Sequence, residues 1–383
     1  MGDEAPRKVV AAACLGRLGR WGNQVLQYAA CKLAAELHGC QLLCPDWAGR
    51  RVLAGAAEDG WLSDEVEAHL PLCADRPVLS HAGWLAWART REPLLSAYDG
   101  AAISGRQVRR LLPQVNASVL DASATAPAAL ERAHAWWGWF QFHTSAFAAH
   151  RLRFRSLFTL TPGCALALSR ALEAARGGDV RPIWGLHVRL GEGFVDLHAA
   201  PAEESGSVPP PPSADEPRAE WTPPTQGGLE ASCCSTTGVW KDTGVFWSAP
   251  AEWYSRWLCT ALAAWKGPKP VLVLCSDVPK QAARALRPLG VRTLAEVLGA
   301  HGHDGLVAAF GGGENGAALA DWHFLSACDA LAISNSTFSF TAAMLADAGD
   351  ADAQPFCAVR PDPNAGALVA FNAWDAQPTL KRT

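Results

Sequence analysis

The stretch VVAAACLGRLGRWGNQVLQYAACKLAAELH at residues 9–38 gives the first indication of the fold class. Residues 9–15 form an unbroken apolar run that is too short to cross a membrane, so they predict a buried strand. Residues 16–22 contain glycines that favour a turn, and the apolar residues of 23–38 recur at helical spacing. The stretch therefore predicts a strand, a loop and a helix, with Asn23 and Gln24 at the start of the helix.

The second half of the chain repeats this alternation of strand and helix. Apolar runs predict strands at residues 181–188, 270–276 and 330–334. Amphipathic or alanine-rich runs predict helices at 251–265, 280–288 and about 337–346. Strands that alternate with helices form a mostly parallel sheet covered on both faces, so the predicted fold class is α/β.

Length and composition indicate two domains. The chain has 383 residues, about twice the length of a typical domain, and its 49% hydrophobic content is that of a globular protein. Residues 1–178 and 179–360 are predicted to form two Rossmann-like halves, and residues 361–383 a tail.

Two stretches of the second half predict irregular structure. About residues 199–245 contain SVPPPPSADEPRAEWTPPTQGG, whose prolines and small polar residues cannot build a core, so a disordered insertion is expected there. The glycines of residues 300–319 predict a mobile loop that borders a ligand cleft.

Charge and cysteine patterns exclude several classes of protein. A formal net charge of −4 provides no basic face for a nucleic-acid backbone, so no nucleic-acid partner is expected. The twelve cysteines contain no Cys-x-x-Cys pair, which favours reduced thiols. His301 and His303 lack further ligands at a recognisable spacing, so no metal site is predicted. The sequence shows no secretory signal or transmembrane segment, which predicts a cytoplasmic location.

Two predicted helix starts carry polar side chains close behind a strand. Ligands of open α/β sheets bind at this edge, where unpaired N–H groups and the helix dipole favour an anion. The residues are Gly22, Asn23 and Gln24 in the first half and Asn335, Ser336 and Thr337 in the second. Taken alone, each set also fits ordinary helix capping.

Two predicted strands end at charged or titratable residues. His187 and Arg189 lie on the same side of their strand, because alternate residues share a face. A guanidinium holds two phosphate oxygens and stabilises charge on a departing diphosphate. Asp277 follows the strand at 270–276, where a carboxylate can accept the paired N–H donors of guanine. The alternatives are an arginine paired with an acid, a hydrogen-bonded core histidine and an aspartate in a turn.

Five separated segments together carry a family resemblance. They are GRWGNQVLQYA at 19–29, WGWFQ at 137–141, HVRLGE at 187–192, CSD at 275–277 and DWHFLSACDALAISNSTFSF at 321–340. In this order they resemble the motifs of the GDP-fucose-dependent α-1,2-fucosyltransferase family. The resemblance extends from residue 9 to about residue 345, apart from the insertion, and the last segment is the most specific.

The resemblance implies two Rossmann-like domains of the GT-B type with a cleft between them, residues 1–178 on the acceptor side and residues 179–360 as the nucleotide-sugar domain. It implies an inverting, metal-independent transfer, without a cofactor, from GDP-fucose to a galactose-containing glycan. Its assignments in the donor half are the catalytic pair His187 and Arg189 at the ribose and diphosphate, Asp277 at guanine, and Ser336, Thr337 and Phe338 at the diphosphate. Gly22, Asn23 and Gln24 would face the donor across the cleft.

The sequence departs from the family pattern at three places. Leu190, Glu192 and Phe340-Thr341 stand where the family has an arginine, an acid and a Trp-Trp pair. A catalytically silent relative that binds a nucleotide or a glycan therefore stays open, as does a protein O-fucosyltransferase. A dehydrogenase is disfavoured, because the first loop lacks the Gly-x-Gly-x-x-Gly spacing. The resemblance also makes Golgi membrane association a second expectation for location.

Overall fold

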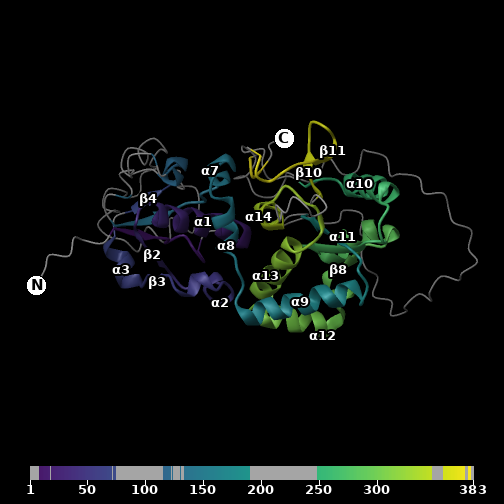
Figure 1. The fold of residues 1–383 in the computed structure, drawn as a ribbon, viewed down its shortest axis with the longest axis horizontal. Helices are drawn as coiled ribbons and strands as arrows, with labels where there is room; N and C mark the ends of the chain where they lie inside the picture. The colour runs from purple at the N-terminus through teal and green to yellow at the C-terminus, as the bar shows by residue number, and fades with distance from the viewer. Residues whose placement is uncertain are drawn as a thin grey trace, which may run out of the picture.

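Two β-sheets, one from each half of the chain, form the framework of the computed structural model (Figure 1). The structure describes residues 8–17, 19–70, 72–74, 115–121, 123, 130, 133–189, 248–346, 357–375 and 378–380. Leu190, Glu192 and the predicted insertion at 199–245 lie outside these described residues.

The first sheet has five strands in the order β3-β2-β1-β5-β4, and every neighbouring pair is parallel. Its strands are β1 (Val9–Ala11), β2 (Gln41–Cys44), β3 (Gly60–Trp61), β4 (Leu72–Ala74) and β5 (His134–Trp137). Its helices are α1 (Trp21–Leu37), α2 (Gly49–Val52), α3 (Asp64–His69), α7 (Ser145–Ala148) and α8 (Arg151–Ser156), with short 3-10 turns η1 (Gly55–Ala57) and η3 (Ala117–Leu120).

Among the described residues, the second sheet has six strands in the order β11-β10-β9-β6-β7-β8, and of their pairs only β10–β11 is antiparallel. Its strands are β6 (Ile183–Val188), β7 (Val271–Ser276), β8 (Arg292–Thr293), β9 (Ala330–Ala332), β10 (Cys357–Asp362) and β11 (Ala367–Ala370). Its helices are α9 (Pro162–Arg176), α10 (Ala251–Ala264), α11 (Pro279–Leu286), α12 (Leu294–Ala309), α13 (Gly313–Ser326) and α14 (Thr337–Ala346), with the 3-10 turn η4 (Arg287–Leu289). The predicted α/β fold class is confirmed.

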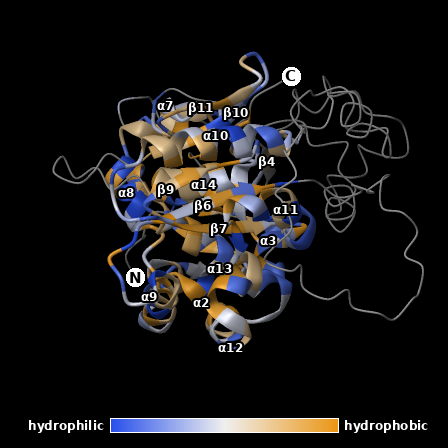
Figure 2. Ribbon diagram, turned by 90° about the vertical axis from the view of Figure 1, so that its right-hand side faces the viewer, coloured by the Kyte–Doolittle hydropathy of each residue, from blue (hydrophilic) through white to orange (hydrophobic). Residues whose placement is uncertain are grey.

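Helices cover both faces of the second sheet, because its central strands are apolar on both sides. Leu272 and Leu274 of β7 pack in one cluster with Leu258 of α10. Val273 of the same strand belongs to the opposite cluster, which includes Phe324 of α13. Figure 2 shows β7 and its neighbours as hydrophobic strands between helices.

An aromatic cluster joins the two halves of the molecule. Trp21, in the first turn of α1, lies 5.7 Å from Trp322 of α13, measured between ring centroids. Phe158 lies 5.8 Å from Trp322 by the same measure. The two sheets are therefore held together through a shared apolar core.

Three predictions from the sequence need correction. Only residues 9–11 of the predicted strand 9–15 are extended, although Ala12 through Leu15 are fully buried. Residues 300–319 are mainly helical rather than a mobile loop, because Leu306 and Phe310 pack into the core and hold α12 and α13 in place. The predicted tail at 361–383 includes the end of β10 and all of β11, which complete the second sheet. The predicted domain limits themselves stay a prediction.

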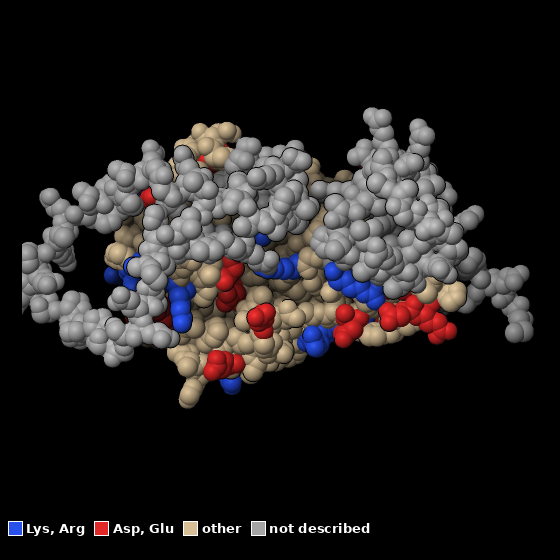
Figure 3. Space-filling model, turned by 180° about the vertical axis from the view of Figure 1, so that it is seen from behind, with Lys and Arg blue, Asp and Glu red and all other residues tan. Residues whose placement is uncertain are grey.

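Surface charge is mixed on the face shown in Figure 3, where basic and acidic side chains of the described residues are interspersed. Among the helices described, none combines the length and apolar character that a membrane span requires.

Candidate functional site

The starts of α1 and α14 lie against each other (Figure 1). A Cβ placed on Gly22 would come within 2.3 Å of the backbone nitrogen of Phe338, so only glycine permits this approach. Beside it, the Thr337 hydroxyl donates to the side-chain oxygen of Asn23 at 2.9 Å. Two predicted helix starts that are distant in sequence therefore form one site.

The loop after β5 also reaches this junction. Gln141 Nε2 donates to Asn23 Oδ1 at 2.8 Å, so the same oxygen receives a second hydrogen bond. Gln24, the other half of the Asn-Gln pair, donates instead to the carbonyl of Gly19 at 3.2 Å. Asn23 therefore contacts the second half of the chain, whereas Gln24 hydrogen-bonds the loop that precedes its own helix.

His187 is buried near the end of β6 and binds the start of α14. Its Nδ1 lies 2.7 Å from the Ser334 hydroxyl and 2.9 Å from the Ser339 hydroxyl. Its ring lies 5.0 Å from the Phe338 ring, measured between centroids. Burial lowers the pKa of His187 to about 4, with a smaller lowering from Arg189, so the imidazole is neutral at pH 7. The neutral ring can exchange hydrogen bonds with these hydroxyls without carrying charge.

Arg189 follows β6 directly and lies among charges from other elements. Partial burial lowers the pKa of Arg189, the carboxylate of Asp277 after β7 opposes that effect, and Arg20 lowers it further. Arg20 precedes α1, so a second guanidinium from the first half of the chain lies in electrostatic range of Arg189. Two cations and one acid thus gather at the edge where β6 and β7 end.

The hydroxyls predicted to hold a diphosphate already have protein partners. Ser336 Oγ accepts from the backbone N–H of Phe338 at 3.3 Å, which is a helix-capping contact. Thr337 Oγ1 is engaged by Asn23. A ligand at the start of α14 would therefore bind backbone N–H groups and the positive helix end first, and would take these hydroxyls only by exchange.

Two residues beside the junction, and one buried acid that contacts β7, were not assigned from the sequence. Arg20 and Gln141 lie within the quoted segments GRWGNQ and WGWFQ, which is the signal that could have identified them. Asp321 of α13 begins the segment DWHFLSAC and hydrogen-bonds the Cys275 thiol of β7. Burial raises the pKa of Asp321 to about 7, so this carboxyl is partly protonated near neutral pH.

No group of three or more histidine, cysteine or acidic side chains is arranged to hold a metal ion within the part of the chain that the structure describes. His303, from the HGHD stretch, lies on α12 with Nδ1 3.9 Å from the Asp304 carboxylate.

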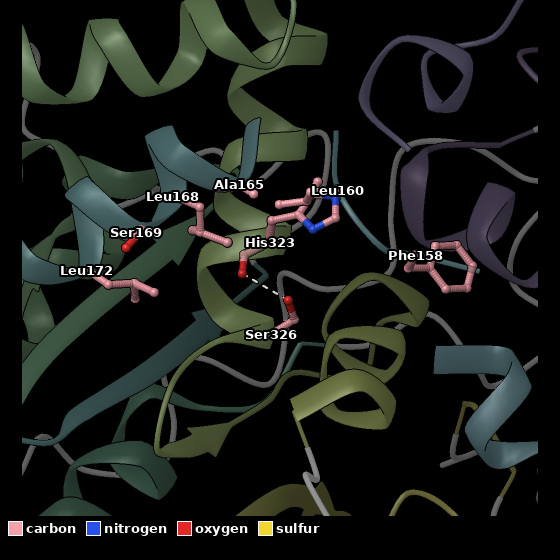
Figure 4. Close-up of a pocket in the computed structure, with 8 residues that line it drawn as sticks. All are labelled: Phe158, Leu160, Ala165, Leu168, Ser169, Leu172, His323 and Ser326. Atoms are coloured by element: carbon pink, nitrogen blue, oxygen red, sulfur yellow. Dashed lines mark hydrogen bonds between the residues drawn. The ribbon is translucent and has the colours of Figure 1, made fainter. Parts of the chain in front are cut away.

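A separate cavity of about 400 Å³ lies between α9 and α13 (Figure 4). Its lining is apolar except for Ser169, His323 and Ser326, and the Ser326 hydroxyl already donates to the backbone oxygen of His323 at 2.8 Å. None of the predicted site residues lines this cavity. The cavity and the α1–α14 junction are therefore distinct places in the fold.

Comparison with known proteins finds similar structures. No protein-family model matches the chain, and no curated protein matches its sequence. The fucosyltransferase NodZ from Bradyrhizobium has a TM-score of 0.49 and 15% identity, over 96% of this chain and 99% of that chain. A mutant of Arabidopsis thaliana FUT1 in complex with GDP has a TM-score of 0.44 and 13% identity, over 97% and 75%. POFUT1 in complex with GDP-fucose has a TM-score of 0.45 and 11% identity, over 94% and 99%. At these identities the similarity is one of chain arrangement.

Proposed function

We propose that this protein is an inverting, metal-independent glycosyltransferase that moves fucose from GDP-fucose to a sugar hydroxyl, as a galactoside α-1,2-fucosyltransferase. The observation that supports it best is the hydrogen bond between Thr337 and Asn23, which brings together the start of α14 and the start of α1. Both segments belong to the motifs that carry the family resemblance. The acceptor in this proposal is a galactose-containing glycan.

Charge on the leaving group is the chemical problem that the site addresses. When the fucosyl bond breaks, the sugar gains positive character and GDP gains negative charge. Arg189, with Arg20 close enough to influence its pKa, supplies fixed positive charge at the end of β6. The start of α14 adds the positive end of its dipole. In this proposal both hold the diphosphate more tightly in the transition state than in the ground state.

His187 and Asp277 have supporting roles in the proposed donor site. His187 is neutral and hydrogen-bonded to two serines, so it offers directional contacts to the ribose and diphosphate without adding charge. Asp277 lies near Arg189, where its carboxylate can accept the N–H donors of guanine. Phe338 packs on the His187 ring and fixes its plane.

The test is incubation of the purified chain with GDP-fucose and a panel of glycan and peptide acceptors, with transfer and GDP release both measured. Transfer to the 2-hydroxyl of a terminal galactose is the expected result. Transfer only to serine or threonine of a peptide would point instead to a protein O-fucosyltransferase. Tight GDP binding with neither transfer nor release would identify a silent relative and overturn the proposal.

A further inference from the structure

We propose that Gln141 is a positioning residue that fixes the side-chain amide of Asn23 with its N–H₂ group available to the donor substrate. The identity of the ligand, a nucleoside diphosphate sugar, rests on the proposed function. The hydrogen bond between Gln141 and Asn23 is observed in the structure.

The side-chain oxygen of Asn23 is held from both halves of the molecule. Gln141 Nε2 donates to it at 2.8 Å from the loop after β5, and Thr337 Oγ1 donates to it at 2.9 Å from α14. An amide oxygen has two lone pairs, so these two donors use its full accepting capacity. The orientation that satisfies both donors places the nitrogen of the Asn23 amide on the other side.

The N–H₂ group of Asn23 keeps its donors for a further partner, since none of the described residues accepts from it. A Cβ on Gly19 would lie within 2.5 Å of Asn23 Nδ2, so the glycine keeps space beside the amide. The backbone of Gly19 has φ of +76°, which other residues adopt only with strain. Because Gly19 has no side chain, nothing from this position blocks the nitrogen of the Asn23 amide.

The orientation of the amide determines what an incoming phosphate meets. With the oxygen held by Gln141 and Thr337, Asn23 presents its N–H₂ on the side of Gly19, in the loop that leads into the anion-favouring start of α1. If the amide turned over, its oxygen would face the phosphate and repel it. Thr337 adapts to either orientation by rotating its hydroxyl, so it cannot impose one alone. Gln141 can adapt only by turning over its whole amide, so with Nε2 toward Asn23 it favours the orientation in which the Asn23 oxygen accepts.

Two substitutions at Gln141 separate positioning from space filling. Gln141→Ala removes the donor and should weaken GDP binding about 3- to 10-fold, the value of one neutral hydrogen bond. Gln141→Glu keeps the size but can only accept at neutral pH, so it should attract the Asn23 N–H₂ and turn the amide over. The glutamate variant should therefore bind GDP more weakly than the alanine variant. Gln141→Glu in the Asn23→Ala background measures the repulsion of GDP by the new charge alone, so only the extra loss seen with Asn23 present reports the amide orientation, and a purely space-filling side chain would show no such extra loss.

The matched control is Ser145→Ala. Ser145 lies on α7 and contacts the His143 ring at 2.9 Å rather than Asn23. Its GDP affinity should equal that of the wild type. Melting temperatures of all variants, compared with the wild type, show whether each one is folded.

The decisive experiment is a double-mutant cycle of Gln141→Ala and Asn23→Ala, with GDP affinity measured by calorimetry and KM and kcat for GDP-fucose measured in parallel. In the Asn23→Ala background, Gln141→Ala should have no further effect. Independent losses of affinity in the two variants, or a glutamate variant no weaker than the alanine variant, would overturn the role of Gln141. The cycle measures GDP binding, so it tests the role of Gln141 even if the wild type transfers no fucose. Absence of transfer would overturn the proposed function but not the role of Gln141. A wild type that binds no GDP would overturn both proposals.

Discussion

Thr337, at the first position of α14, donates its hydroxyl to Asn23 of α1 at 2.9 Å across 314 positions of sequence. The bond ties the helix that follows β9 in the second sheet to the helix that follows β1 in the first. Each helix alone offers only an anion-binding end. Their contact, with Arg20 in electrostatic range of Arg189, is where we propose that a charged ligand is held from two sides.

Removal of Arg189 should slow the proposed reaction. Arg189→Ala is expected to raise the barrier by about 3 to 4 kcal/mol, roughly a 100- to 1000-fold loss of kcat, because it deletes a preorganised charge at the leaving group. The measurement is single-turnover transfer from GDP-fucose. Arg284→Ala on the exposed side of α11 is the control and should be neutral. Turnover near that of the wild type in Arg189→Ala would remove the catalytic assignment.

Enlargement of Gly22 should separate α1 from α14. In Gly22→Ala the new Cβ would meet the Phe338 backbone at 2.3 Å, so the helices must move apart. The expected cost is about 1–3 kcal/mol of unfolding free energy, together with weaker GDP binding. Urea denaturation measures the cost. Gly163→Ala in the first turn of α9 has no atom within 4 Å of the added Cβ and serves as a control that should not destabilise. Equal stability of both variants would contradict the close packing.

The buried histidine predicts a loss of stability in acid. The pKa of His187 is about 4 in the folded protein and 6.5 ordinarily, so the unfolded chain binds more protons between these values. Its contribution to stability is complete above pH 6.5 and is lost as pH falls toward 4. His187→Phe should flatten this part of the curve and cost about 1–3 kcal/mol at pH 7, because Ser334 and Ser339 lose their hydrogen-bond partner. His323 is also buried and has a lowered pKa, so the stability of the variant should still decrease to some extent as the pH falls. An unchanged acid limb in the variant would count against a neutral His187.

Asp321 predicts the opposite dependence. Its pKa is raised from 3.8 to about 7, so the folded protein binds more protons than the unfolded chain in this range. This carboxyl therefore makes the protein less stable as pH rises from about 4 to 7. Asp321→Asn should flatten that decline, so the variant gains melting temperature relative to the wild type at pH 8 but not at pH 4. Thermal melts at the two pH values provide the test, and a constant difference between the proteins would exclude the raised pKa.

Local patterns predicted the elements of the second sheet well. The predicted helix at 337–346 has the observed bounds of α14, and β7 begins one residue inside the predicted 270–276. These segments have strong apolar periodicity and clear ends, which are local properties. The start of α1 was placed two residues late, because the packing of Trp21 on Trp322 favours helix there.

Features that depend on tertiary contacts could not be predicted in this way. The glycines of 300–319 predict a loop, yet the burial of Leu306 and Phe310 outweighs the low helix propensity of these glycines. The kink inside α12 falls at Gly299, whose φ is 70°. The Gln141–Asn23 contact depends on how a loop of the first sheet folds back over α1. The approach of Arg20 to Arg189 depends on how the two halves dock, which no local pattern records.

A crystal structure of the chain with GDP tests the proposed donor site. We expect a diphosphate within about 3 Å of the Arg189 guanidinium and of the first backbone N–H groups of α14, with the Asn23 amide beside it. A diphosphate bound elsewhere, for instance in the cavity between α9 and α13, with Arg189 and Thr337 making no contact to it, would contradict the proposal.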